Sequence, residues 1–413
     1  MRVTDASSLL TAQADLQALL KAGLADDGAV VRLLDRLLVW AHALRASDLH
    51  FEPYEGIYRI RIRVDGQLQE WLRPPLAVRE RVASRIKVLA RLDIAEKRLP
   101  QDGRLRHQLA AGQWADFRVS TLPTVHGEKL VVRLIDAAPA QLDLDALGYA
   151  AEQKAAVLQA LARSHGMILV TGPTGAGKTL SMYSCLQRLN RTGVNICTAE
   201  DPCEINLAGI NQVSIHEKAG LTFAVALRSF LRQDPDVIMI GEVRDLETAD
   251  MALKAAQTGH LVFSTLHTND APSTLLRLRQ IGVAAHNVAA SVVLITAQRL
   301  LRRLCPHCRR EISPPLQMMR EAGCPPADWA GGEPIYEPVG CERCLGGYLG
   351  RIGVFQVMPV SAAMAELVLR DAGVAELARQ AAQEGVMSLR QAAWGKVKLG
   401  QTSIEEVLAH THA

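Results

Sequence analysis

The sequence has few aromatic residues and almost no excess of either charge. Phe, Trp and Tyr make up 4% of the 413 residues, and the formal net charge is +3. A nucleic-acid binder more often carries a strong basic balance, or a basic stripe with interleaved aromatic side chains. The composition therefore argues against DNA or RNA as a partner, and we expect no nucleic acid among the ligands.

Low-complexity tracts and an export signal are also lacking. No long tract of Ser, Gln or Pro occurs, and the 49% hydrophobic content suffices for more than one packed core. The start of the chain has no basic segment followed by an apolar core, so we expect a protein that stays inside the cell. The uncharged run from Ile281 to Gln298 is interpreted as a buried helix and not as a membrane span, because polar residues interrupt it.

Hydrophobic periodicity predicts an α/β chain with several parts. An amphipathic helix is expected from Val30, and an alternating strand from Tyr58 to Val64 leads into a turn at Asp65-Gly66. Strands and helices then alternate up to about Leu304, which is typical of a mostly parallel sheet covered by helices on both faces. We predict an N-terminal segment (1–28), a small α/β domain (29–136), a linker (137–148), the parallel-sheet core (149–304), a tetracysteine subdomain (305–353) and a C-terminal helical region (354–413).

The stretch GPTGAGKT follows an apolar strand and precedes a helix, and it fits the phosphate-loop pattern GxxxxGK[ST]. Its glycines let backbone N–H groups turn toward phosphate oxygens. Lys178 is expected to reach the β and γ phosphates of ATP, and the Thr179 hydroxyl to bind Mg²⁺. The predicted nucleotide-binding residues are Gly172, Pro173, Thr174, Gly175, Ala176, Gly177, Lys178 and Thr179.

Acidic residues follow two further apolar strands. Glu242 comes after the run Val237 to Ile240, and parallel strands present their C-terminal ends to the ligand crevice, so this carboxylate is expected to hold Mg²⁺ or its water. The segment EDPCE contains Glu200, Asp201 and Glu204. One of these acids is expected to position and deprotonate the attacking water, and the alternative is a solvated acidic turn.

His267 ends another apolar strand, whereas His260 precedes that strand. Their separation of seven residues along a strand does not suit two ligands of one metal. A lone histidine is usually structural, but the position of His267 favours a sensor of the γ-phosphate.

Two CxxC pairs predict a metal site. Cys305 and Cys308 form the first pair, and Cys341 and Cys344 form the second. Four thiolates in two tight pairs suit tetrahedral Zn²⁺ in a closed structural site. A redox-active dithiol and an Fe–S cluster are the alternatives. The other four cysteines have no such spacing and are interpreted as small buried side chains.

These motifs together resemble the type II/type IV secretion ATPases, a family that includes type II secretion motors and type IV pilus assembly motors. The resemblance runs from roughly Val30 to Gly353 and beyond, and rests on ASDLHFEPYE, RLDIAEKRLPQDGR, FRVSTLPTVHGEK, the phosphate loop, EDPCE, GLTFAVALRSFLRQDPDVIMIGEVRDLETA, TGHLVFSTLHTNDAPSTL and the cysteine pairs. The sequences KAAQTGHLV and NDAPSTL look more similar to those of the pilus assembly motors than to those of the secretion motors.

The resemblance implies a RecA-like ATPase core, an N-terminal PAS-like domain and a homohexamer at the cytoplasmic face of the inner membrane. Such motors associate with the membrane through partners and drive an inner-membrane platform protein that moves pilin subunits into a filament. By motif position, the general base matches Glu204 and the Walker B acid matches Glu242. Arginines that reach toward nucleotide match Arg104, Arg118, Arg228, Arg232, Arg244 and Arg277.

Three alternative functions are considered. A type II secretion motor differs in its partners and not in its chemistry. A RecA-like nucleic-acid motor shares the phosphate loop but calls for a basic and aromatic strip. A non-catalytic partner of a second ATPase is the third alternative. Within the family pattern, Gln356 stands where Glu is common and Leu180 where Thr is frequent, and neither change removes a group that hydrolysis needs.

Overall fold

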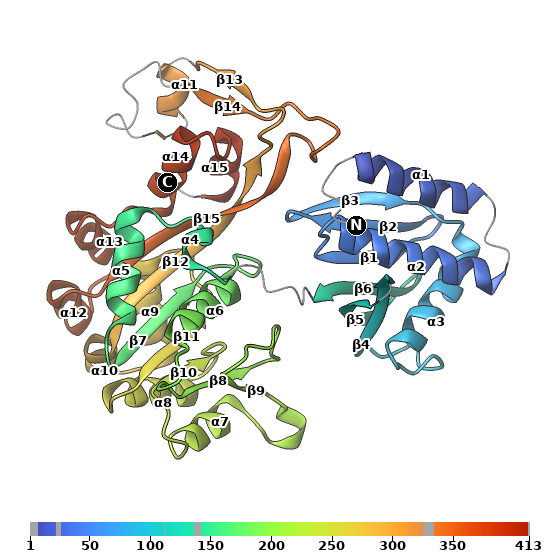
Figure 1. Ribbon diagram of the computed structural model, residues 1–413. Coiled ribbons are helices and arrows are strands. Elements are labelled where there is room, and N and C mark those ends of the chain that lie inside the picture. Colours follow the sequence, from blue (N-terminus) through green and yellow to red (C-terminus); the bar gives the residue numbers. More distant parts are fainter. Residues whose placement is uncertain are drawn as a thin grey trace. The chain divides into compact units, whose positions relative to one another are not determined.

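The protein divides into two compact units in a computed structural model (Figure 1). The structure describes residues 7–21, 26–110, 112–135, 142–314, 316–321, 323–324 and 334–411. The N-terminal unit comprises Met1–Pro139 with Cys305–Arg309 and Pro338–Gly350, and the parallel-sheet unit comprises Ala140–Leu304, Arg310–Glu337 and Arg351–Ala413. Part of the predicted linker 137–148 lies outside the described residues.

An antiparallel sheet of six strands, in the order β3-β2-β1-β6-β5-β4, forms the frame of the N-terminal unit. Its strands are β1 (Asp48–Pro53), β2 (Tyr58–Val64), β3 (Gln67–Leu72), β4 (Gln101–Ala110), β5 (Gln113–Thr124) and β6 (Gly127–Ile135). Its helices are α1 (Ser7–Lys21), α2 (Asp27–Ala43), the short 3-10 helix η1 (Leu76–Val78) and α3 (Arg79–Leu89).

The alternation predicted for β2 is confirmed. Tyr58, Ile60, Ile62 and Val64 are buried in one hydrophobic cluster with α2 and α3, and the arginines between them are partly exposed. Each buried aliphatic side chain of this kind stabilises the fold by about 1.5–3 kcal/mol. The turn to β3 has positive φ at Asp65 and Gly66, as a two-residue hairpin turn with right-handed twist requires.

Seven strands form the sheet of the other unit, in the order β15-β12-β7-β11-β10-β8-β9. These strands are β7 (Gly166–Thr171), β8 (Ile196–Glu200), β9 (Asn211–Ser214), β10 (Val237–Ile240), β11 (Leu261–Leu266), β12 (Val292–Leu304) and β15 (Tyr348–Pro359). The pairs from β12 to β9 are parallel. A separate antiparallel pair consists of β13 (Arg310–Ile312) and β14 (Ile335–Glu337).

Helices cover both faces of the parallel sheet (Figure 1). Alternate residues of β7 belong to two different hydrophobic clusters, Met167 and Leu169 to one and Ile168 and Val170 to the other, as the period of two in a strand requires. The helices of this unit are α4 (Leu144–Leu147), α5 (Ala151–Leu161), α6 (Lys178–Leu189), η2 (Glu217–Ala219), α7 (Phe223–Phe230), α8 (Leu246–Gln257), α9 (Ala271–Ile281), α10 (Ala285–Ser291), α11 (Leu316–Glu321), α12 (Ala362–Leu369), α13 (Val374–Gln383), α14 (Leu389–Lys398) and α15 (Ile404–His410).

The prediction of one buried helix over Ile281 to Gln298 is wrong. Only Ala285–Ser291 is helical within this run after α9 ends, and β12 begins at Val292. The run of β-branched and apolar residues from Val292 to Thr296 pairs with β7, and pairing in the sheet outweighs the helical spacing of the apolar positions. In the part of the chain that the structure describes, no helix has the length and apolarity that crossing a membrane requires.

The C-terminal helices complete the core instead of lying apart from it. Trp394 and Val397 of α14 are buried in the same cluster as residues of β7 and β10. The strand β15 crosses the predicted boundary between residues 353 and 354 and is an edge of the parallel sheet. The limits of the six predicted segments remain predictions.

Candidate ATP-binding site

The phosphate loop connects β7 to α6 as predicted. All six residues of β7 are buried, and Gly177 caps α6 with a φ of 86°. Gly172 also has positive φ, and a Cβ atom there would lie 2.6 Å from the Gln298 carbonyl oxygen, so a larger residue does not fit. The Gln298 side chain donates to the Ala176 carbonyl at 2.6 Å, which fixes the loop to β12.

The Lys178 ammonium lies against the loop that precedes it. Its Nζ donates to the carbonyl oxygens of Gly172 and Pro173 at 2.8 and 3.1 Å. Burial lowers the pKa of Lys178, and the nearby Glu242 carboxylate acts in the opposite direction. A partly desolvated cation at a phosphate loop is suited to bind phosphate oxygens.

Three predicted residues come together at the ends of three neighbouring strands. His267 follows β11, and its Nε2 lies 3.4 Å from Glu242 Oε2. Its Nδ1 lies 3.5 Å from Lys178 Nζ. Glu242 follows β10, two residues after Ile240. The parallel order β7-β11-β10 explains the grouping, because it places the carboxyl ends of these strands on one edge.

The residues present also fit Mg²⁺. Thr179 is the second residue of α6, and Glu242 follows the end of β10 on the same edge of the sheet. Hydroxyl and carboxylate oxygens are the ligands that Mg²⁺ prefers, and it usually completes its shell with water and substrate phosphates. The predicted roles of Thr179 and Glu242 as ligands, and of His267 as a sensor, remain predictions.

The three acids of EDPCE have different environments. Glu200 is 4% exposed and accepts hydrogen bonds from Tyr183, Thr198 and Gln212. Asp201 and Glu204 are exposed in the turn after β8. Only Glu204 among these acids lacks a side-chain hydrogen bond or ion pair with the residues that the structure describes. It is therefore the acid best placed to meet a solvent molecule.

Arg244 links the ends of β8 and β10. Its Nε donates to Glu242 Oε1 at 2.7 Å and its Nη2 to Asp201 Oδ2 at 3.2 Å. Its Nη1 lies 3.6 Å from Glu217 Oε1. The sequence did not predict this network, since Asp201 and Arg244 are 43 residues apart in the chain. The guanidinium ties the acidic turn to the strand that carries Glu242.

The remaining predicted arginines lie on exposed or half-buried surfaces. Arg228 pairs with Glu247, Arg232 donates to the Arg228 carbonyl at 2.9 Å, and Arg277 is exposed on α9. Arg104 on β4 is exposed and lies directly opposite the half-buried Arg118 on β5 in the N-terminal unit. Contact of any of these arginines with nucleotide stays a prediction.

His260 has a structural position, as is usual for a lone histidine. Its Nδ1 lies 2.9 Å from the Ala255 carbonyl oxygen, and its backbone carbonyl accepts from Gly166 N at 3.1 Å. These contacts join the end of α8 to the start of β7. The residue lies at the opposite end of β11 from His267.

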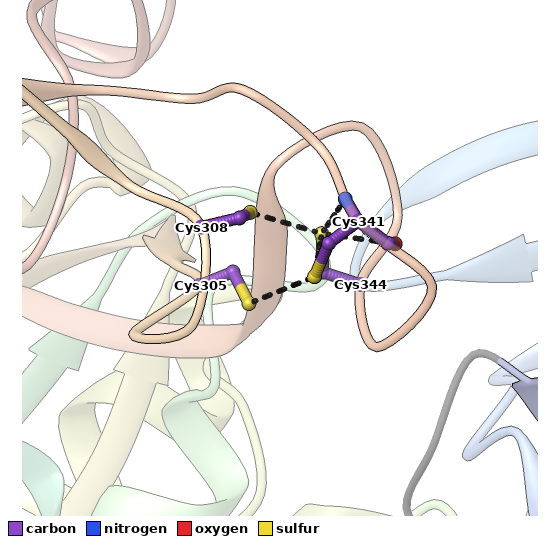
Figure 2. A group of neighbouring side chains, drawn as sticks. All are labelled: Cys305, Cys308, Cys341 and Cys344. Atoms are coloured by element: carbon purple, nitrogen blue, oxygen red, sulfur yellow. Dashed lines mark hydrogen bonds between the residues drawn. The ribbon is translucent and has the colours of Figure 1, made fainter.

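The four cysteines of the CxxC pairs form one cluster (Figure 2). Their sulfur atoms all lie within 4.8 Å of one another, with Cys305–Cys341 at 3.9 Å and Cys308–Cys344 at 3.6 Å. Tetrahedral Zn²⁺ with Zn–S bonds of about 2.3 Å requires sulfurs ~3.8 Å apart. The backbone N–H of Arg343 lowers the pKa of Cys341 and so favours a thiolate. The cluster is compatible with the predicted closed zinc site.

Three of the other four cysteines agree with the prediction of small buried side chains, and Cys203 does not. Cys185, Cys197 and Cys324 are buried, and Cys203 is half-buried in the EDPCE turn. None of the described cysteines forms a disulfide. Burial raises the pKa of Cys185 to about 12, so this thiol is a poor nucleophile.

A buried parallel strand, a phosphate loop capping a helix, and a carboxylate at the tip of a nearby strand define a P-loop nucleotide-binding protein. The family described as "Type II/IV secretion system protein" matches residues 23–409. The chain belongs to this family. The predicted family and the α/β fold class, with a RecA-like core, a PAS-like N-terminal domain and a small four-cysteine subdomain, are thereby confirmed.

The relatives of this chain include pilus and secretion proteins. It is 53% identical to "Type IV pilus assembly ATPase PilB" of Acinetobacter baylyi over 93% of this chain and 66% of the relative. It is 52% identical to the protein of the same name from Pseudomonas aeruginosa over 93% of this chain and 68% of that relative. A more distant relative, 42% identical over 94% of this chain and 76% of its own length, is "Type II secretion system protein E" of Aeromonas hydrophila.

The fold is similar to that of a solved pilus motor. The crystal structure of "the Pilus Retraction Motor PilT and Bound ADP" superposes with a TM-score of 0.61 at 25% identity, over 92% of this chain and 97% of that one. These similarities bear out the predicted class, an ATPase. The chain spans about two thirds of the length of the pilus assembly relative from Acinetobacter baylyi.

Proposed function

We propose that the protein hydrolyses ATP to drive type IV pilus assembly. The observation that carries the proposal is the series of side chains at the ends of four neighbouring strands: Lys178 after β7, His267 after β11, Glu242 after β10 and Glu204 after β8. Identity above 50% with pilus assembly ATPases supports the type IV pilus as the filament that is assembled. By analogy with the family, we propose a homohexamer at the cytoplasmic face of the inner membrane.

The residues of the chain divide the work of hydrolysis. The loop N–H groups and Lys178 bind the phosphates and offset their charge. Thr179 and Glu242 would hold Mg²⁺, which would offset a further part of the phosphate charge. Glu204 accepts a proton from the attacking water while the new P–O bond forms, and the bond to ADP breaks. His267 lies next to Glu242 and Lys178. It would sense the γ-phosphate by donating a hydrogen bond to it, and this bond is lost when the phosphate leaves.

Arg104 and Arg118 are proposed to act in the assembled hexamer. Two cations in directly opposed positions on β4 and β5 give the N-terminal unit a concentrated positive charge. Such a charge stabilises phosphate in the transition state when it comes from a neighbouring domain. In that case both arginines should affect hydrolysis by the hexamer more than hydrolysis by isolated subunits.

A platform protein of the inner membrane is the proposed partner, and the resulting membrane association is peripheral. A second candidate function, a type II secretion motor, is favoured by the relative from Aeromonas hydrophila. Both candidates share the chemistry of the site and differ in the filament that is moved. The cysteine cluster is proposed to hold Zn²⁺ in a structural role.

Deletion of the gene, with complementation by the natural chain or by Lys178→Ala, tests the proposal. We expect loss of surface pili and twitching on deletion, recovery with the natural chain and no recovery with the variant. Lost exoprotein release with intact pili would favour the secretion motor. Normal pili and normal secretion in the deletion strain would contradict both candidates.

A further inference from the structure

A buried tyrosine connects the helix after the phosphate loop to the turn that carries Glu204. Tyr183 lies on α6 with 0% of its surface exposed, and its hydroxyl donates a hydrogen bond to Glu200 Oε2. Burial and the bond to Glu200 raise the pKa of Tyr183 above its usual range, and the backbone N–H groups of Glu204 and Ile205 act in the opposite direction. The hydrogen bond to Glu200 ties α6 to the residue that directly precedes the turn.

Glu200 is held by neutral donors on every side. Thr198, two residues earlier on the same face of β8, donates to Oε1 at 2.6 Å, and Gln212 Nε2 donates to the same oxygen at 3.1 Å. With Oε2 accepting from Tyr183, both carboxylate oxygens are engaged and shielded from water. This environment suits a residue that fixes its neighbours and does not suit one that takes a proton from solvent water.

Gln212 of β9 fixes the turn from the other side. Its Nε2 donates to the Ile205 carbonyl at 3.0 Å, and its Oε1 accepts from Leu207 N at 2.6 Å. Ile205 and Leu207 also pack in the hydrophobic cluster that contains Tyr183. The backbone on the C-terminal side of Glu204 is thus anchored by hydrogen bonds and by packing, while the Glu204 side chain is exposed.

We infer that Tyr183, Glu200 and Gln212 are positioning residues that hold Glu204 in place for hydrolysis. The network joins Glu204 to α6, whose first two residues are Lys178 and Thr179, so the base and the phosphate-binding residues share one rigid support. The inference rests on the proposed function, because it takes Glu204 as the general base. Small displacements matter in such a site, since about 1 Å can cost roughly 10²-fold in rate.

The test is a double-mutant cycle in steady-state ATP hydrolysis by the full chain. Tyr183→Phe removes the hydroxyl and keeps the ring, and we expect a fall of roughly 10- to 100-fold in kcat with little change in KM for ATP. In a Glu204→Gln background the same change should lower the rate less than about twofold, because the residue through which it acts is already disabled. An equal loss in both backgrounds would show a general structural contribution and would overturn the inference.

Two further variants keep the result interpretable. Thr198→Val removes another donor to Glu200 with almost no change of shape, so it serves if Tyr183→Phe does not fold, and the same dependence on Glu204 is expected. Tyr58→Phe is the matched control. This tyrosine is fully buried in the N-terminal unit, and its hydroxyl has no hydrogen-bond partner among the described residues. It should leave hydrolysis unchanged.

Failure of the inference can be told from failure of the proposed function. If Glu204→Gln hydrolyses ATP like the natural chain, Glu204 is not the base and the proposed mechanism is wrong. If Glu204→Gln is inactive and Tyr183→Phe keeps the natural kcat, the mechanism stands and the positioning role is wrong.

Discussion

The two units place buried carboxylates in different surroundings. In the N-terminal unit, Glu52 is 2% exposed and lies among three cations: Arg59 at 3.0 Å, Arg61 at 2.7 Å and Lys129 at 3.1 Å. In the parallel-sheet unit, Glu200 is 4% exposed and accepts hydrogen bonds from two hydroxyl groups and one amide group. Glu52 is thus neutralised by cations within a sheet, whereas Glu200 is held by neutral donors beside the turn that carries Glu204.

This difference follows from the topology of the sheets. In the antiparallel sheet, cross-strand neighbours on β1, β2 and β6 face one another along one side, so Asp48 lies opposite Arg63 and Arg133, and Glu52 lies opposite Arg59. In the parallel sheet the strands are buried on both faces, and polar groups gather at the carboxyl ends. We conclude that the ion pairs around Glu52 stabilise the fold of the first unit, whereas the polar groups at the strand ends of the second unit lie where the proposed ATP site is.

The largest effect is expected for Lys178→Ala in the parallel-sheet unit. Loss of this cation should lower ATP hydrolysis at least about a hundredfold, because phosphate charge in the transition state is no longer offset. Steady-state phosphate release measures it. Lys154→Ala is the control, since Lys154 is a surface residue paired with Asp145 on the neighbouring helix. Turnover near the natural rate in Lys178→Ala would exclude the phosphate loop as the catalytic site.

Cys305→Ser should release Zn²⁺ and destabilise the segments around the cluster, because metal binding in a closed site contributes folding free energy. Metal analysis of the purified chain should give about one zinc per natural chain and much less in the variant. Cys324→Ala, which alters a buried cysteine outside the cluster, should keep its zinc. Iron in place of zinc, or no metal in the natural chain, would contradict the zinc site.

Glu52→Gln should lower the stability of the N-terminal unit by roughly 3 kcal/mol at neutral pH. Burial alone would raise the pKa of Glu52, but hydrogen bonds from Arg61, Lys129 and Arg59 lower it from 4.5 to about 2. A depressed pKa contributes stability that is fully present above the unfolded-state value. That contribution is lost as the pH falls from about 4.5 to about 2.

Thermal unfolding of the two chains between pH 7 and pH 2 measures this effect. The difference in stability should be greatest at neutral pH and should shrink toward pH 2. Glu55→Gln is the control, because Glu55 is exposed two residues beyond the end of β1. A difference that does not depend on pH would mean that shape, and not charge, explains the loss.

The parts of the protein that depend on short stretches of chain were predicted well. The phosphate loop with its flanking strand and helix, the alternating strand of β2 and the two cysteine pairs each lie within a few consecutive residues. The helix predicted over Ile281 to Gln298 is wrong from Val292 onward, because pairing with β7, and not the local spacing of apolar residues, decides the structure there.

The polar network of the site could not be predicted in the same way. Tyr183 and Glu200 are 17 residues apart and Glu200 and Gln212 are 12 apart, so no local pattern marks their contact. One weak signal was available: Thr198 and Glu200 alternate toward one face of a short buried strand. Polar residues at such positions need partners, and those partners come from the neighbouring helix and strand.

Single-turnover hydrolysis by Glu204→Gln, with Mg²⁺-ATP affinity measured on the same protein, tests the central claim most directly. Glutamine keeps the shape of the side chain but cannot accept the proton from water. The account predicts nearly natural affinity and a rate roughly 10²-fold or more below that of the natural chain. A natural rate in Glu204→Gln together with a large loss in Glu200→Gln would contradict it and would assign the base to the buried acid.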